Sequence, residues 1–179
     1  MLKSITVKLC LLTFVLTIVG CGFKLRGDYG LPASINTLQL VAAQSNTPLH
    51  RILGKQLKSF NVEVVDNSAT ALSTEQQIDA LVYLKSDRLE RRLLSLFSTG
   101  QIAEYELVLT IKYQLQFPEQ NPLDIEFDVT REYQDDPNAV LAKSRELDLI
   151  LNEMRQDAAS RIIRQIASSH SNAQKVSGS

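Results

Sequence analysis

Residues 102–117, IAEYELVLTIKYQLQF, alternate apolar and polar side chains more regularly than any other stretch of this 179-residue chain. Successive side chains of a β-strand point to opposite faces, so this period of two predicts a strand with one buried and one solvated face. The predicted buried face holds Tyr105, Leu107, Leu109, Ile111, Tyr113, Leu115 and Phe117. Val108 is the one apolar exception on the other face. The stretch therefore indicates a half-buried strand of an antiparallel sheet.

The flanking segments predict two further strands, which complete a three-stranded meander. After a turn bounded by two prolines, residues 123–134 repeat the alternation, although Arg131 falls on the otherwise apolar face. On the other side, residues 78–98 lead into a turn at 98–101. No single alternation fits the whole of 78–98, which predicts a bend or bulge near Asp87.

The segment before the meander predicts a βαβ unit. Strand-like residues 35–42 and 62–65 flank a helical pattern that begins at Pro48, with Thr47 placed to cap it and Asn61 to end it. Threonine suits an N-cap, and proline suits the first helical position because it lacks an N–H. The apolar stripe of this helix is Leu49, Ile52, Leu53, Leu57 and Phe60. The unit most simply has parallel strands and a right-handed crossover.

The segment after the meander predicts a long helix. Asp135, Asp136 and Pro137 suit its start, and Ser144 is able to cap a restart, so two pieces stay possible. The helix is expected to end near residue 168. Its buried stripe is Leu147, Ile150, Met154, Ala158, Ile162 and Ile166.

These segments predict an α+β fold, with two helices packed on one face of a mixed four- to five-stranded sheet. The chain runs through a βαβ unit, a polar loop at 66–77, an antiparallel meander and the long C-terminal helix. Residues 35–168 are expected to form a single domain, preceded by a tether at 21–34. Residues 169–179 are polar and lack core-forming side chains, which predicts a disordered tail.

The N-terminus predicts export and lipid attachment. Residues 1–20 have two lysines and an apolar run too short for a transmembrane helix, which is the layout of a signal peptide. The sequence IVGC, ending at Cys21, resembles the bacterial lipobox, which implies that the cysteine is acylated and becomes the first mature residue. Glycine rather than aspartate at position 22 implies the outer membrane, on the periplasmic side. An ordinary signal peptide with an incidental cysteine stays the alternative.

The residue inventory points away from an enzyme and from a metal or cofactor site. His50 and His170 have no nearby partner at metal-ligand spacing, and both cysteines fall within the first 21 residues. No phosphate-binding loop, dinucleotide fingerprint or serine nucleophile motif is present. With 19 basic and 20 acidic residues, the charge balance does not favour nucleic acid. The carboxylates of the strands fall on the solvated face, and a hydrolase that uses two of them stays an alternative.

Basic residues are the candidate binding groups. They are Lys85, Arg88, Arg91 and Arg92 in the long first strand of the meander, Arg131 in the last, and Lys143 just beyond it. The simpler interpretation is a set of solvated or salt-bridged surface cations. The alternative is recognition of an anionic, lipid-bearing ligand, because arginine makes bidentate phosphate contacts and lysine supplies a mobile charge. Arg131 is expected to need a partner if it points inward.

Several segments together resemble the LptE family of lipopolysaccharide-assembly lipoproteins. They are the lipobox with CGFKLRG, then PLHRILGKQLKSFNVEVVD, STGQIAEYELVLT and REYQDDPNAVLAKSRELDLILNEMRQDAASRIIRQI. They cover most of residues 21–167 in the order found in the family. The most specific pieces are the GQ-x-AEY turn and strand and the DP-x-x-x-LAK block.

The resemblance implies a non-enzymatic function. Members of this family plug the outer-membrane β-barrel LptD, assist its assembly and take part in delivering lipopolysaccharide to the outer leaflet. It also implies lipopolysaccharide binding through basic residues, of which the LAK lysine is Lys143. The arginine that some members carry before the GQ turn is absent, since Ser98 and Thr99 stand there. Arg91, Arg92 and Arg131 are the candidate substitutes, and a free periplasmic lipid carrier or chaperone is the alternative function.

Overall fold

The computed structural model describes residues 30–44, 46–66, 77–136 and 138–177. Its elements along the chain are β1 (Thr37–Ala42), α2 (Pro48–Ser59), β2 (Glu63–Asp66), β3 (Ala80–Leu96), β4 (Ile102–Gln116), β5 (Leu123–Gln134) and α3 (Val140–Ser177). The predicted signal peptide, Cys21 and most of the predicted tether lie outside the described residues. The predicted α+β fold, with two helices on a mixed sheet, is confirmed.

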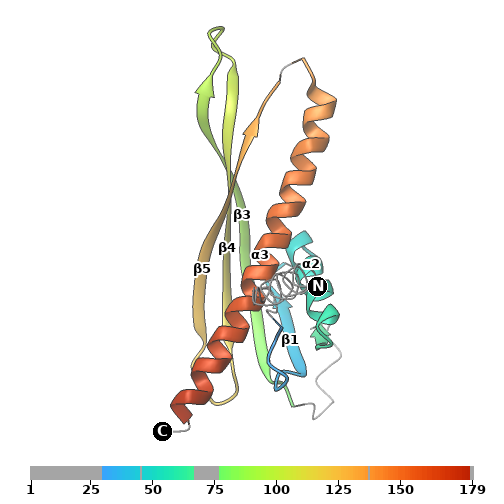
Figure 1. Ribbon diagram of the computed structural model, residues 1–179, viewed down its shortest axis with the longest axis vertical. Coiled ribbons are helices and arrows are strands. Elements are labelled where there is room, and N and C mark those ends of the chain that lie inside the picture. Colours follow the sequence, from blue (N-terminus) through green and yellow to red (C-terminus); the bar gives the residue numbers. More distant parts are fainter. Residues whose placement is uncertain (1–29, 45, 67–76, 137, 178–179) are drawn as a thin grey trace, which may run out of the picture.

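The sheet has the strand order β2-β1-β3-β4-β5. β1 pairs in parallel with β2, as a βαβ unit requires, and also in parallel with β3. Strands β3, β4 and β5 form the antiparallel meander. The register of β3 against β4 shifts between Leu84 and Ser86. This irregularity confirms the bulge that was expected near Asp87. The meander strands are long and twisted, and they extend well beyond β1 and β2 (Figure 1).

The alternation of β4 places its odd-numbered residues in the core. Leu107, Leu109, Ile111, Tyr113 and Leu115 are all buried. Val108, the exception on the other face, is buried as well. In register it lies between Glu90 of β3 and Thr130 of β5, whose side chains flank it on the same face.

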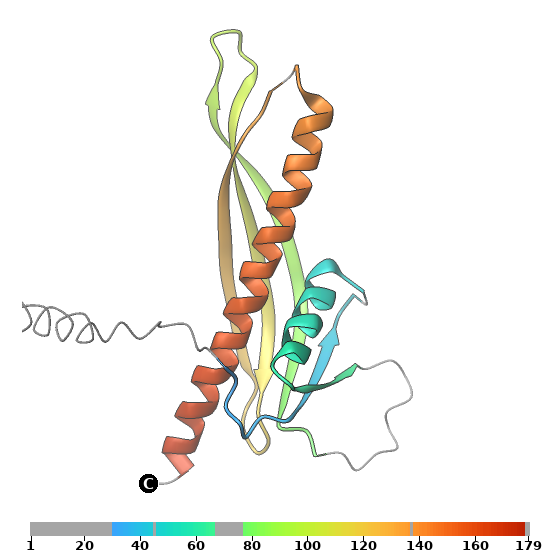
Figure 2. The same cartoon turned by 45° about the vertical axis from the view of Figure 1, so that its right-hand side comes forward.

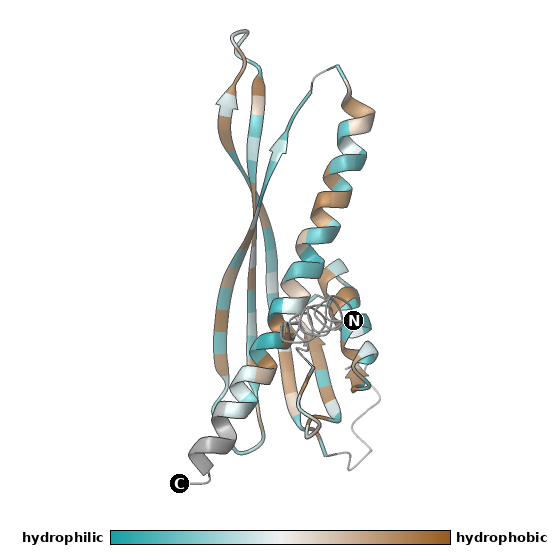
Figure 3. Ribbon diagram, viewed as in Figure 1, coloured by the Kyte–Doolittle hydropathy of each residue, from teal (hydrophilic) through white to brown (hydrophobic). Residues whose placement is uncertain are grey.

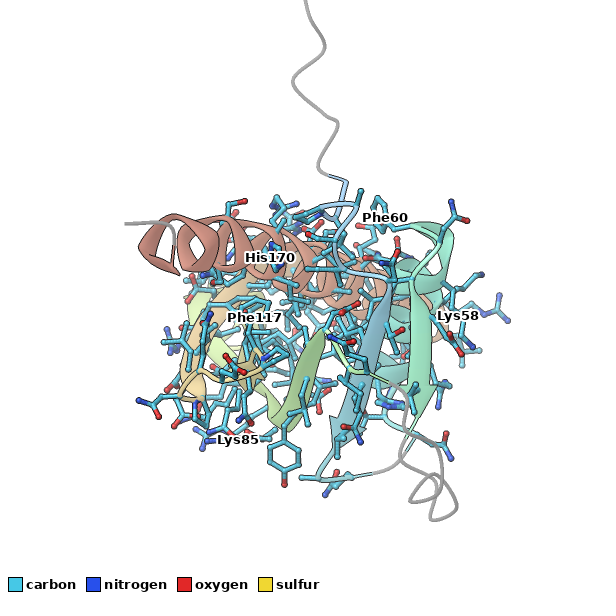
Figure 4. The ribbon with its side chains drawn as sticks, turned by 90° about the horizontal axis from the view of Figure 1, so that it is seen from below. Lys58, Phe60, Lys85, Phe117 and His170 are labelled. Atoms are coloured by element: carbon cyan, nitrogen blue, oxygen red, sulfur yellow. The ribbon has the colours of Figure 1, made fainter. Side chains whose placement is uncertain are left out.

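Helix α2 begins and ends where its sequence predicts. The Thr47 side chain accepts a hydrogen bond from the His50 backbone N–H (3.2 Å), and Pro48 occupies the first turn. Asn61 follows the helix in the left-handed conformation, with φ of 61°. Phe60, expected in the buried stripe, is instead the C-cap and is exposed (Figure 4).

Both helices pack on the same face of the sheet (Figure 2). Met154, Ala158, Ile162 and Ile166 of α3 are fully buried, as the helical spacing predicts. Burying a side chain such as isoleucine contributes about 1.5–3 kcal/mol, so this stripe is a large part of the free energy that holds α3 to the sheet. The N-terminal part of α3 runs on past α2, beside the long meander strands (Figure 1).

Helix α3 differs from expectation at both ends. It starts at Val140, because the carboxylate of Asp136 accepts a hydrogen bond from the Asn138 backbone (2.9 Å) in a turn before the helix. It is one helix across Ser144, not two pieces.

The predicted disordered tail is also wrong for residues 169–177, which are helical. The sequence has no glycine or proline between Val140 and Ser177, so nothing in it stops the helix. The His170 ring also packs edge-on against Phe117, with ring centroids 5.6 Å apart (Figure 4). Of the helices in the described ranges, none has an apolar stretch of the length needed to cross a membrane.

Candidate functional site

Strand register brings two of the predicted arginines to the same face of the sheet. Leu107 of β4 pairs with Arg91 of β3 on one side and with Arg131 of β5 on the other. Directly paired residues point to the same side of a sheet, so both arginines lie on the face that carries the helices. The next row toward the β3–β4 turn consists of Leu93, Tyr105 and Tyr133.

Arg131 has the partner that its inward position predicted. Its guanidinium forms an ion pair with Asp157 of α3 and donates a hydrogen bond to the Thr130 carbonyl oxygen (2.9 Å). Both side chains of the ion pair are about half exposed, at 43% and 51%. The pair therefore contributes little to stability, about 0.2–1 kcal/mol. Arg131 keeps access to solvent.

Lys143 joins this region from α3. Its ammonium lies 5.4 Å from the centre of the Tyr133 ring, and the Tyr133 hydroxyl donates to the Lys143 carbonyl oxygen (3.0 Å). The ammonium also donates to Glu146 (2.9 Å). This hydrogen bond raises the pKa of Lys143, which holds the positive charge throughout the neutral range. Burial raises the pKa of Tyr133, so its hydroxyl stays a neutral donor.

Arg91 completes the group on this face. It lies one row from Tyr133 on the same face of the sheet, since Arg91 pairs with Leu107 and the next row holds Tyr133. Within the described ranges, Arg91 has neither an ion pair nor a hydrogen bond from its side chain. We call Arg91, Arg131 and Lys143 the cation cluster. Of its members, Arg91 has the charge least offset by the residues that the structure describes.

Arg92 lies on the opposite face, so the structure does not bring it to the cation cluster. It is within 3.6 Å of carboxylate oxygens of Glu90 and Glu106. The other basic residues of β3 behave in the same way, since Lys85 pairs with Asp124 at 2.5 Å and Arg88 pairs with Glu90. The arrangement of these three matches the simpler interpretation, that of salt-bridged surface cations.

Exposed apolar side chains lie at the same end of the molecule as the cation cluster. They are Leu93, Leu94, Leu96 and Phe97 near the β3–β4 turn, with Val140 and Leu141 at the start of α3. We call this set the apolar end (Figure 3). Leu141 is 80% exposed. Sequence reasoning missed this feature, although the run LLSLF, which fits no alternation, was its signal.

Comparisons with known proteins identify the family. The family model for LptE, described as lipopolysaccharide-assembly, matches residues 35–166. A relative from Pectobacterium atrosepticum named "LPS-assembly lipoprotein LptE" is 37% identical over 152 residues, which is 85% of this chain and 79% of the relative. The chain belongs to the LptE family. A relative of the same name from Photorhabdus laumondii is 32% identical over 161 residues, covering 90% of this chain and 84% of the relative.

A solved structure of an LptE-like lipoprotein supports the fold. The crystal structure of rare lipoprotein B from Shewanella oneidensis has 35% sequence identity to this chain and a TM-score of 0.67. The match covers 78% of this chain and 99% of that one. Membership of the LptE family supports a role in lipopolysaccharide transport, which is not enzymatic.

The side chains of this region combine positive charge with exposed hydrocarbon. Among the described residues, no group of three or more histidine, cysteine, aspartate or glutamate side chains is placed to hold a metal ion. Cations beside exposed apolar groups instead match a ligand that has both anionic groups and hydrocarbon. The site combines a neutral donor, Tyr133, with three positive charges in the cation cluster.

Proposed function

We propose that this chain is a lipid-anchored outer-membrane subunit that plugs the LptD β-barrel and helps it to assemble. It also takes part in delivering lipopolysaccharide to the outer leaflet. The observation that supports this function is the cation cluster beside the apolar end. Sugar phosphates match the cation cluster, and acyl chains match the apolar end. Membership of the LptE family also supports a role in lipopolysaccharide delivery.

In this proposal, the lipid anchor is attached to Cys21. Two or more acyl chains, at about 0.8 kcal/mol for each buried methylene, hold a protein stably on a membrane. Mass spectrometry of the mature chain tests the anchor. We expect an acylated cysteine at its N-terminus, and an unmodified N-terminus or cleavage at another position would contradict the proposal.

The free lipid carrier receives less support. A carrier needs an enclosed apolar cavity, whereas the space between sheet and helices is filled by one cluster of buried side chains that includes residues of both helices and all three meander strands. Most of the exposed large apolar side chains among the described residues belong to the apolar end, where they are not enclosed, and Phe60, Leu123 and Leu149 are the exceptions.

Lipopolysaccharide binding by charge variants tests the proposed ligand site. Arg91→Ala, Arg131→Ala and Lys143→Asp are combined in one variant, and its affinity is measured at low and high salt. We expect at least a tenfold loss, about 1.4 kcal/mol, and a weaker salt dependence than in the unaltered protein. Lys85→Ala, on the opposite face of the sheet, is the matched control and is expected to bind normally. Unchanged binding by a folded triple variant would mean that the cation cluster is ordinary surface.

A further inference from the structure

A groove lies between the C-terminal half of α3 and strands β4 and β5, further from the β3–β4 turn than the cation cluster. It has a volume of about 720 Å³. This volume is within the range of about 300–1,000 Å³ that is usual for small-molecule sites. The residues that matter for its chemistry are Gly30, Tyr113, Ile125, Phe127, Arg161 and Arg164.

The floor of the groove is largely apolar. The rings of Tyr113 and Phe127 meet edge to face, with centroids 6.2 Å apart. Ile125 lies beside them on β5, and Ala167 closes the α3 side. An open strip of aromatic and aliphatic side chains of this kind matches a hydrocarbon chain, because removing apolar surface of both from water is favourable.

One polar atom in this floor has no partner. Tyr113 is 1% exposed, and its hydroxyl forms no hydrogen bond with any part of the chain that the structure describes. Buried polar groups are nearly always paired, so an unpaired hydroxyl that lines a groove calls for a ligand atom. Burial raises the pKa of Tyr113, so the hydroxyl is a donor and the matching ligand atom is an oxygen acceptor.

Two arginines of α3 give the rim a positive charge. The Arg161 guanidinium donates to the Asp128 carbonyl oxygen (2.9 Å) and lies 5.7 Å from the Phe127 ring centre. Arg164 follows almost one turn later and also lines the groove. Glu126 is on the rim as well, but it is paired with Lys112 at 3.1 Å. The rim therefore favours a ligand with a negative charge.

The groove is also at the end where the chain enters the described structure. Gly30, the first described residue, is one of its lining residues, and Cys21 lies nine residues earlier. A chain spans at most about 3.3–3.6 Å for each residue, so an acylated Cys21 keeps Gly30 within about 30 Å of the membrane. The nearest abundant amphiphiles are then the phospholipids of that leaflet.

We propose that this groove binds one acyl chain of an anionic phospholipid from the membrane leaflet. The chain lies on Tyr113, Ile125 and Phe127, Arg161 and Arg164 hold the phosphate, and the Tyr113 hydroxyl donates to an oxygen of the lipid. The choice of a membrane lipid rests on the anchor proposed above. The binding chemistry rests on the groove alone.

A binding titration tests the groove separately from the proposed function, because it involves neither the lipid anchor nor the barrel. The full mature chain carrying Cys21→Ser, which needs no detergent, is titrated with lysophosphatidylglycerol below its micelle-forming concentration. Lysophosphatidylcholine with the same acyl chain is the comparison without net charge. Calorimetry gives the affinity, and amide chemical shifts locate the site. We expect saturable binding of the anionic lipid, at least about tenfold tighter than that of the comparison lipid, with shifts around residues 113, 125–127 and 161–168.

Substitutions in the groove identify which side chains contribute to lipid binding. Ala167→Trp fills the groove and is expected to abolish binding, and Arg161→Gln with Arg164→Gln is expected to weaken it about tenfold. Tyr113→Phe keeps the shape of the groove and is expected to weaken lipid binding about threefold. This variant tests the proposal if Ala167→Trp fails to fold. Arg145→Gln, the same change on an exposed part of α3, is the control. Absent or non-saturable binding, equal binding of both lipids, or full binding by the folded variants would overturn the proposal.

Discussion

Three cations from different elements reach one region because register and helix position direct them there. Arg91 and Arg131 flank Leu107 across three strands, and Lys143 reaches the Tyr133 ring from the first turn of α3. The three differ in what offsets their charge. Arg131 has Asp157 and Lys143 has Glu146, whereas Arg91 has only a long-range interaction with Tyr133 among the described residues. Arg91 is therefore the residue whose charge a ligand is best placed to use.

The direction of Arg131 was predictable from the sequence, but that of Arg91 was not. Before the irregularity between Leu84 and Ser86, even-numbered residues of β3 face the helices, and from there to Leu93 odd-numbered ones do. A shift of one residue moves every later side chain to the other face. The sequence placed a bulge near Asp87 but did not show at which residue the alternation changes, so it could not decide between Arg91 and Arg92. Asp157 was also unpredictable as a partner, because it depends on how α3 lies on the sheet.

The Asp157→Asn variant tests whether Arg131 belongs to a ligand site. Removing the carboxylate leaves the guanidinium free for a phosphate, so we expect lipopolysaccharide affinity to rise. The free energy of unfolding should fall by no more than about 1 kcal/mol, because the ion pair is half exposed. Asp148→Asn, the same change on the opposite side of α3, should alter neither quantity. A lower affinity in a folded Asp157→Asn protein would contradict the assignment of Arg131.

Asp124 lies on the face of the sheet that carries no helix, and its ion pair there predicts a pH dependence. The hydrogen bond from Lys85 lowers the pKa of Asp124 below 3.8. A carboxyl whose folded pKa is lowered stabilises the fold above its ordinary pKa, and this contribution is lost as the pH falls through the lowered value. An NMR titration of the Asp124 carboxyl should therefore give a midpoint below 3.8. The midpoint should move upward in Lys85→Gln, and an unchanged midpoint would show that the pair does not form in solution.

Helix α3 is held to the rest of the fold by the buried residues of its middle part. Its buried stripe was predictable from helical spacing, since Met154, Ala158, Ile162 and Ile166 all lie in the core. Its C-terminal limit was not predictable, because polar composition indicated a disordered tail where the helix in fact runs to Ser177. Composition measures how much apolar surface a segment is able to bury, but a helix already held by its core residues extends through any segment that lacks a breaker.

Two alanine substitutions on α3 test this view of the helix. Ile162→Ala removes a fully buried side chain and should lower the free energy of unfolding by about 2–5 kcal/mol. Leu149→Ala, at a position that is 63% exposed, should change it by less than about 0.5 kcal/mol. Denaturant unfolding of both variants gives the comparison. Similar losses in the two would mean that the upper part of α3 packs against the sheet more closely than described.

The molecule as a whole separates two sites along its long axis. The apolar end and cation cluster lie by the β3–β4 turn and the start of α3, while Gly30 lines the groove near the other end of α3 (Figure 2). At about 1.5 Å for each residue, the 18 residues from Lys143 to Arg161 of the groove span about 27 Å along α3. Arg131 lies between these two points, because its partner Asp157 is about one helical turn from Arg161. A chain anchored at the groove end therefore holds Lys143 about 27 Å further along the molecule than the groove.

This separation was only partly predictable from the sequence. The alternating strands and the helical stripe predicted the layers of the fold. They did not predict that the meander and α3 would project beyond β1 and β2, because strand lengths alone do not give the stagger between paired strands. The resemblance to the LptE family suggested the proposed function, and the structure adds the place where the cations and exposed apolar groups meet.

The most direct test of the proposed function is to purify the tagged lipoprotein from native membranes in mild detergent. Mass spectrometry then identifies what accompanies it and in what ratio. The plug interpretation predicts a large outer-membrane β-barrel in roughly stoichiometric amount, retained through washing. Recovery of the protein alone, carrying only lipid, would contradict the plug and favour a free lipid carrier.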